Sequence, residues 1–262
     1  MKLTEKNYFS RKAEQEYMSV SQFKAFEECQ AAALAMIKGK YKRPKTVAML
    51  VGSYVDSYFE GTLDKFRAEN PEIFKKDGTL KSEFIQAEQI IKRLEKDRLF
   101  MSYMNGQKQV IMTGVIEGIP VKAKADVLHK NKIVDLKIVK DFKPIYKADE
   151  GKLSWYQAWG YDMQGGVYQE IARQYIGKKL PFYLNAGTKE KITDLGIWHI
   201  NQDLLDFGLN YFKDKIVLYD AIKKGLIPAE RCEKCEFCKM TKKLKSVIES
   251  GEELDFFDFE EE

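Results

Sequence analysis

The chain has 262 residues, of which 44% are hydrophobic, with 44 basic and 40 acidic side chains and a net charge of +4. This size predicts one domain over residues 1–251. The chain has only two histidines, which excludes a multi-histidine metal site. No apolar run is long enough to span a membrane and no secretory signal stands at the start, so we expect a cytoplasmic protein without a membrane partner.

The charge is unevenly distributed along the chain. Residues 252–262 contain seven acidic and no basic side chains, and we interpret them as a disordered acidic tail. Residues 1–251 then carry +11, a balance that favours a polyanionic partner such as DNA.

Three helical stretches are expected in the first 104 residues, after an irregular lead-in over residues 1–18. The first runs from Ser19 to about residue 38 and contains Cys29; Ser19 and Gln22 have the spacing of a capping box. The second covers residues 47–60, and within it Asp56 and Glu60 lie one turn apart on one face. The third, residues 80–104, has the apolar period of a packing helix.

Three short strands follow, at about residues 108–117, 119–129 and 132–138. Alternation places four apolar side chains of the middle strand on one face: Val121, Ala123, Ala125 and Val127. Lys122, Lys124 and Asp126 take the other face, and Asp135 and Lys137 share a face of the third strand.

Two aspartates and a lysine on these strands have the chemistry of a metal site. Asp126 and Asp135 offer the hard oxygen ligands that Mg²⁺ or Mn²⁺ binds, and Lys137 lies beside Asp135 in the alternation. An acidic-x-basic triplet alone means little in a chain with 40 acidic and 44 basic residues. However, Asp135 stands in an apolar strand, where an unpaired carboxylate is costly to bury.

The rest of the pattern is a charged loop over 141–151, a helix over 153–176, strands over 181–186 and 195–200, and a helix over 203–224. In the first of these helices a polar and aromatic stripe repeats at intervals of four, three and four residues: Gln157, Tyr161, Gln164 and Tyr168. That spacing predicts one helical face, and a face of this composition indicates a function beyond packing.

These motifs together resemble the PD-(D/E)XK nuclease superfamily, in particular RecB-like and RecE-type phage exonucleases. The resemblance implies an α/β restriction-endonuclease-like core, a mixed central sheet flanked by helices. It also implies a metal-dependent DNA exonuclease that hydrolyses phosphodiester bonds in phage or prophage recombination or DNA repair. The segment from Gly52 to Glu60 resembles a family motif, but Asp56 stands where those relatives have a histidine.

The resemblance also implies roles for individual residues. The catalytic set is Asp126, Asp135, Lys137, Gln164 and Tyr168. The metal ligands are Asp126 and Asp135 with Asp56 or Glu60. We expect seven residues to contact DNA: Lys122, Lys124, Lys140, Lys143, Lys147, Gln157 and Tyr161. Two alternatives stay open, a DNA-binding module of the same fold without catalysis and a partner of a phage single-strand annealing recombinase recruited through the acidic tail.

The cysteines form a separate motif. Cys232, Cys235 and Cys238 make a Cys-x2-Cys-x2-Cys run that can converge on one ion or cluster, and Cys29 is the only other cysteine that could complete the site. The resemblance implies a structural 4Fe-4S cluster at these four residues. Zn²⁺ meets the same requirements, and free thiols are the third reading.

Overall fold

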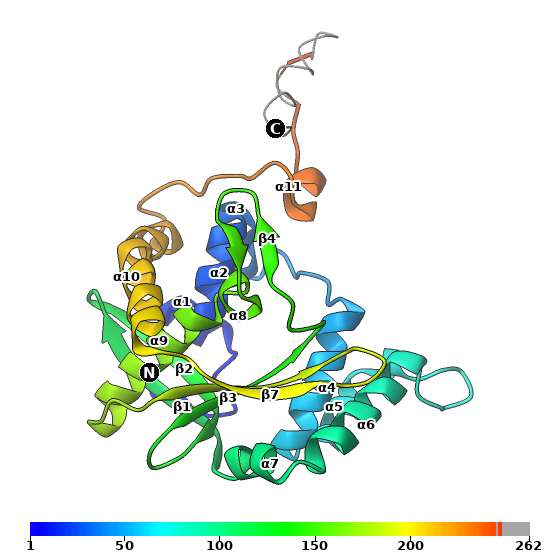
Figure 1. The fold of residues 1–262 in the computed structure, drawn as a ribbon. Coiled ribbons are helices and arrows are strands. Elements are labelled where there is room, and N and C mark those ends of the chain that lie inside the picture. The colour runs from blue at the N-terminus through cyan, green and yellow to red at the C-terminus, as the bar shows by residue number, and fades with distance from the viewer. Residues whose placement is uncertain (245, 248–262) are drawn as a thin grey trace.

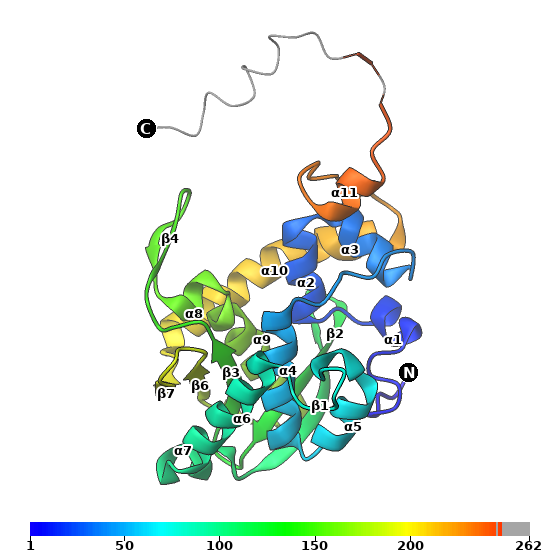
Figure 2. The ribbon, with the colours of Figure 1, turned by 90° about the vertical axis from the view of Figure 1, so that its right-hand side faces the viewer.

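The computed structural model describes residues 1–244 and 246–247, and the acidic tail expected at 252–262 lies outside them. The described chain is built on a five-stranded sheet with helices on both faces, as Figures 1 and 2 show. The expected α/β architecture is therefore present. In the part of the chain that is described, no helix is both long and apolar enough to cross a membrane.

The sheet is mixed, in the order β1-β2-β3-β6-β7. Its strands are β1 (Gln107–Ile116), β2 (Ile119–Leu128), β3 (Ile133–Val139), β6 (Phe182–Thr188) and β7 (Leu195–His199). Only β3 and β6 pair in parallel, and the other neighbours are antiparallel. The hairpin between β1 and β2 turns at Glu117 and Gly118, which both have positive φ.

Each face of the sheet has its own apolar core. One core lies between the sheet and α2 (Val20–Glu28), α3 (Gln30–Ile37), α9 (Tyr161–Ile176) and α10 (Gln202–Lys224). The other lies between the sheet and α4 (Val47–Glu60), α6 (Ser82–Glu95) and α7 (Arg98–Met104).

The smaller elements are peripheral. They are α1 (Arg11–Glu16), α5 (Leu63–Glu69), η1 (Pro71–Ile73), α8 (Trp155–Ala158), α11 (Glu236–Met240) and a hairpin of β4 (Ile145–Lys147) and β5 (Gly151–Leu153). The hairpin replaces the loop expected at 141–151 and projects beside α8 in Figure 2. The lead-in also differs from expectation, because Ser10 caps α1 by accepting a hydrogen bond from the amide of Ala13.

Two glycines allow α9 and α10 to pack closely. A Cβ at Gly166 would lie 2.2 Å from the carbonyl oxygen of Leu205, and one at Gly208 would lie 2.4 Å from Cα of Met163. Any larger residue at either position would push the helices apart. This contact fixes α9 against the sheet and with it the side chains that α9 directs toward β3.

Three of the predicted helices are interrupted. Cys29 adopts an extended conformation (φ −169°, ψ 110°) between α2 and α3. Asp97 ends the helical run after α6 and caps α7 through a hydrogen bond from the amide of Phe100 at 2.8 Å. Gly160, with φ of 59°, separates α8 from α9. The last break divides the predicted stripe, since Gln157 lies on α8 and the other three members lie on α9.

The strands β2 and β3 separate soon after their hairpin. They pair only at Val127–Val134 and Leu128–Ile133, and further along β2 its free edge pairs instead with Met18. The pairing of β1 with β2 skips Asp126, opposite Gln109, whose φ is 54°. The expectation that Val127 shares a face with Val121, Ala123 and Ala125 is wrong, because the alternation of faces breaks at this irregularity and Val127 packs in the core under α4.

Candidate active site

Asp126 lies at the fork where β2 and β3 separate. Its Oδ2 accepts a hydrogen bond from the backbone amide of Leu136 on β3 at 2.9 Å. Its Oδ1 accepts a longer hydrogen bond, 3.4 Å, from Nε2 of Gln109 on β1. The carboxylate thus occupies a place where strand pairing has stopped, and the irregularity at Gln109 directs it toward α4.

Asp135 and Lys137 lie on β3 and form a buried ion pair. Asp135 is 2% exposed, its Oδ2 contacts Nζ of Lys137, and Nε2 of Gln164 donates to its Oδ1 at 2.7 Å. Burial raises the pKa of Asp135 to about 7, against the opposing effect of Lys137. Burial lowers the pKa of Lys137, but Asp135 and Asp126 outweigh it and hold that pKa above its ordinary value.

Asp56 and Glu60 reach the same place from α4. The Oδ1 atom of Asp56 is buried and has no hydrogen-bond partner among the described residues. Burial, and then the negative charge of Asp126, raise the pKa of Asp56 well above its ordinary value, while burial also raises that of Glu60. Lys137 opposes this shift at Asp56 but does not outweigh the burial and the neighbouring carboxylates.

A small cavity of about 10 Å³ lies between these groups. It is lined by Asp56, Phe59, Glu60, Met104, Lys108, Gln109, Asp126 and Leu136. This volume is close to that of one water molecule or one small ion. The donor set, the unpaired oxygen of Asp56 and the cavity fit a hard divalent cation.

The distances between the carboxylates limit how many of them can bind one ion. Among the described residues, no three acidic groups have ligand atoms within 4.8 Å of one another. Magnesium commonly binds one or two protein carboxylates and keeps several waters, so these distances are compatible with a magnesium site.

Two lysines lie near the ring of Tyr161 on α9. Nζ of Lys137 and Nζ of Lys24 each lie 5.0 Å from the centre of its ring. Lys24 comes from α2, donates to the carbonyl oxygen of Trp159 at 2.7 Å, and has its pKa lowered to about 8 by burial and then by Lys137. Sequence reasoning missed Lys24, because a lysine between Phe23 and Phe26 carries no local signal of a site.

The other two members of the stripe have different environments. Tyr168 is packed edge-on against Phe182, with ring centres 6.4 Å apart, and burial and then Asp135 raise its pKa well above the ordinary value. Gln157 accepts a hydrogen bond at 2.5 Å from the hydroxyl of Ser154, which precedes the first residue of α8. The structure therefore places Tyr161, Gln164 and Tyr168 at the site, and Gln157 outside the group that contacts Asp135.

The lysines expected to bind DNA have four different environments. Lys122 is 1% exposed, pairs with Glu14 and donates to the carbonyl oxygen of Tyr8, both at 2.6 Å, so its predicted phosphate contact is wrong. Lys140 and Lys143 are exposed, whereas Lys147 pairs with Glu150 at 2.8 Å. Lys124 lines a groove.

That groove is open, has a volume of about 480 Å³ and leads to the small cavity, with which it shares Asp56, Glu60, Lys108 and Gln109. Its basic residues are Lys45, Lys65, Lys108 and Lys124. Phe9 also lines it, with 72% of its surface exposed and its ring centre 5.5 Å from Nζ of Lys124.

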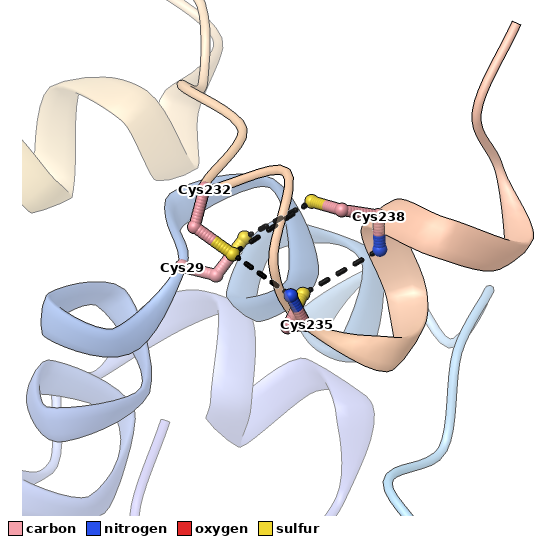
Figure 3. A group of neighbouring side chains, drawn as sticks. All are labelled: Cys29, Cys232, Cys235 and Cys238. Carbon is pink, nitrogen blue, oxygen red and sulfur yellow. Dashed lines mark hydrogen bonds between the residues drawn. The ribbon is translucent and has the colours of Figure 1, made fainter. Parts of the chain in front are cut away.

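The four cysteines meet at a second place. Figure 3 shows Cys29 beside α3 facing Cys232, Cys235 and Cys238 from the loop after α10 and from α11. Their sulfur atoms all lie within 4.8 Å of one another. The predicted convergence of Cys29 with the three late cysteines is therefore present.

A family model described as "PDDEXK-like domain of unknown function (DUF3799)" matches residues 19–241. The chain belongs to this family. The predicted membership of the PD-(D/E)XK superfamily is thus confirmed, and with it the restriction-endonuclease-like fold.

A solved structure supports the same assignment. A crystal structure from Eubacterium rectale, described as a "putative exonuclease", is 42% identical to this PDDEXK-like chain, covers 98% of both chains and has a TM-score of 0.94. The crystal structure of SSO0001 covers 76% of the chain and 86% of its own at 12% identity, but its TM-score of 0.27 is too low to support an argument. No curated protein matches the chain.

Proposed function

We propose that this PDDEXK-like protein is a divalent-metal-dependent deoxyribonuclease that degrades DNA from an end. The observation that carries the proposal is the meeting of Asp126, Asp135 and Lys137 at the fork of β2 and β3, with Asp56 facing them from α4. The exonucleolytic mode is supported by the Eubacterium rectale neighbour, whose description is "putative exonuclease" and which covers nearly the whole chain.

The metal would be held by one or two of the carboxylates that line the cavity, which are those of Asp56, Glu60 and Asp126, with Asp135 of β3 close to Asp126. When bound, Mg²⁺ or Mn²⁺ supplies positive charge beside the scissile phosphate and acidifies water. A cation would also compensate for the burial that raises the pKa values of Asp56 and Asp135.

The protein's own groups position and stabilise the reactants. Gln164 holds one oxygen of Asp135, which leaves the other oxygen facing the Lys137 ammonium. Lys137 stays protonated because Asp135 and Asp126 hold its pKa high, so it can orient a nucleophilic water and stabilise the charge that develops on phosphate. Lys24, which also lies 5.0 Å from the centre of the Tyr161 ring, adds a second positive charge.

The groove would guide the DNA strand to this site. Lys45, Lys65 and Lys124 can neutralise phosphates along it without reading sequence. The exposed ring of Phe9 offers a surface on which a base can stack. A role in phage or prophage recombination, with an annealing recombinase as partner, stays a prediction from the resemblance.

The test is degradation of linear duplex labelled at one end, compared with closed circular DNA, in Mg²⁺ or in EDTA. We expect loss of the linear substrate only, dependent on Mg²⁺, and abolished by Lys137→Ala and by Asp135→Asn. Lys179→Ala, at an exposed lysine paired with Asp206, is the matched control and should cleave normally.

The other outcomes distinguish the alternatives. Cleavage of both the linear and the circular DNA would support a nuclease but would contradict the proposal that it acts from an end. DNA binding without cleavage by any divalent ion would favour the inactive DNA-binding module of this fold.

A further inference from the structure

The four cysteines are drawn from two distant segments into a compact group. Sγ of Cys29 lies 3.6 Å from Sγ of Cys238, and Sγ of Cys232 lies 4.0 Å from it. All four ligand atoms fall within 4.8 Å of one another. Cys29 and Cys238 are buried, and Cys232 and Cys235 are half-buried.

These separations distinguish one ion from a cluster. Four sulfur atoms around one tetrahedral Zn²⁺, each at about 2.3 Å, are separated by about 3.8 Å. In a 4Fe-4S cluster each thiolate binds a different iron at the corner of a cube and points outward, so the iron–iron separation adds to the distance between sulfurs. The observed sulfur–sulfur distances of 3.6 and 4.0 Å fit the single ion.

The backbone around the late cysteines also favours thiolates. The amide of Cys235 donates to Sγ of Cys232 at 3.3 Å, and the amide of Cys238 donates to Sγ of Cys235 at 3.5 Å. Such bonds stabilise negative charge on sulfur. The loop is held further by Arg231, whose guanidinium donates to the carbonyl oxygen of Cys238 at 2.7 Å.

We propose that Cys29, Cys232, Cys235 and Cys238 bind one Zn²⁺ ion in a closed tetrahedral site, in place of the 4Fe-4S cluster that the family resemblance implies. Four protein ligands leave no open position, so the ion is structural and takes no part in catalysis. Its site is lined by none of the residues that surround the cavity next to Asp126.

The ion would clamp the loop after α10 onto the junction of α2 and α3. Neighbouring hydrogen bonds follow the same path, since the amide of Ala31 donates to the carbonyl oxygen of Glu230 and the amide of Glu230 donates to Oε1 of Gln30, both at 2.9 Å. The α2 helix carries Lys24, so the clamp also supports the position of that lysine. Apolar contacts of Ala31, Ala32 and Phe237 also lie at this junction, and the ion would add to them.

The first experiment measures metal and sulfide in wild-type protein that is expressed with both iron and zinc available and is purified without oxygen or chelator. We expect roughly one zinc per chain, no acid-labile sulfide and no visible absorption. Iron with sulfide would overturn the proposal in favour of a cluster. Iron without sulfide, or free thiols without metal, would overturn it as well.

The second experiment uses cobalt and variants. It requires no DNA, so its result does not depend on whether the protein is a nuclease. Wild-type protein loaded with Co²⁺ should show the strong visible bands of tetrahedral thiolate coordination, and Cys232→Ser should lose them together with zinc. Met240→Ser, at a 70% exposed residue of the same short helix, should keep both. Retention of zinc by Cys232→Ser and by Cys235→Ser would reject these ligands.

Discussion

Nε2 of Gln164 donates a hydrogen bond of 2.7 Å to Oδ1 of Asp135, and this contact joins α9 to the central strand of the site. It orients the carboxylate without adding a charge, which leaves the opposite oxygen to Lys137. The close approach of α9 to α10 keeps the glutamine in place. The relationship explains why a polar residue occurs on a helix that otherwise packs on a sheet.

Gln164→Leu should therefore weaken both the fold and the proposed cleavage. The substitution keeps the size of the side chain but removes the donor to a buried carboxylate, a loss of about 1–3 kcal/mol. We expect a lower urea midpoint and at least a tenfold lower rate of cleavage. Unchanged values of both would contradict the role assigned to this hydrogen bond.

Gln174→Leu is the matched control on the same helix. Gln174 bonds the backbone of Val115 through its oxygen and its amide nitrogen, both at 2.8 Å, on the exposed side of α9. Its loss should lower the urea midpoint while leaving the cleavage rate of the folded protein near that of wild type.

Asp56→Asn should stabilise the metal-free protein at neutral and alkaline pH. Burial and Asp126 raise the pKa of Asp56, so the folded state binds a proton more tightly than the unfolded state, whose carboxyl has a pKa of about 3.9. Stability contributed by this group is complete below pH 4 and falls as pH rises through the folded-state pKa. Every tenfold difference in proton affinity between the two states costs about 1.4 kcal/mol, and the neutral amide avoids that cost.

The measurement is the melting temperature in EDTA between pH 4 and pH 9. Wild type should lose more stability than Asp56→Asn as pH rises, and added Mg²⁺ should restore wild type but not the variant. Asp64→Asn, at an exposed acid of α5, should follow wild type throughout. A variant less stable than wild type at pH 8 would contradict the raised pKa.

Features that depend on neighbouring residues can be predicted from the sequence, whereas features that depend on contacts between distant segments cannot. Asp126, Asp135 and Lys137 are local: an apolar strand containing a charge is visible in five residues, and the hairpin before it limits where the strand can pair. The break at Cys29 and the entry of Lys24 into the site depend on α2 packing against α9 and α10, which no short pattern encodes. For Lys122 the predicted face of β2 is correct, but its burial is not predictable from a short pattern, because it pairs with Glu14, over a hundred residues earlier in the chain.

Lys24→Arg should change the pH dependence of DNA binding. Burial and Lys137 lower the pKa of Lys24 to about 8, so its positive charge is lost as pH rises through that value. With Ca²⁺ in place of Mg²⁺, wild-type affinity should fall roughly tenfold between pH 7 and pH 9, the scale of one charge-assisted contact.

Arginine keeps its charge over this range, so the affinity of Lys24→Arg should stay level where wild type declines. Lys140→Arg, at an exposed lysine, should decline as wild type does. Identical profiles for wild type and Lys24→Arg would show that Lys24 does not contact the bound DNA.

Lys122 and Lys124 are two positions apart on β2 and should behave oppositely when changed. Lys124 lines the groove, so Lys124→Ala should weaken DNA binding and reduce the slope of log affinity against log salt by about 0.7–0.9, with stability little changed.

Lys122 is buried with Glu14 and the carbonyl oxygen of Tyr8, so Lys122→Met should cost roughly 1.5–3 kcal/mol of folding free energy. The folded fraction of Lys122→Met should retain the wild-type salt slope, as measured by fluorescence anisotropy from 50 to roughly 300 mM salt. A reduced slope for Lys122→Met together with a wild-type slope for Lys124→Ala would mean that DNA follows a path other than this groove.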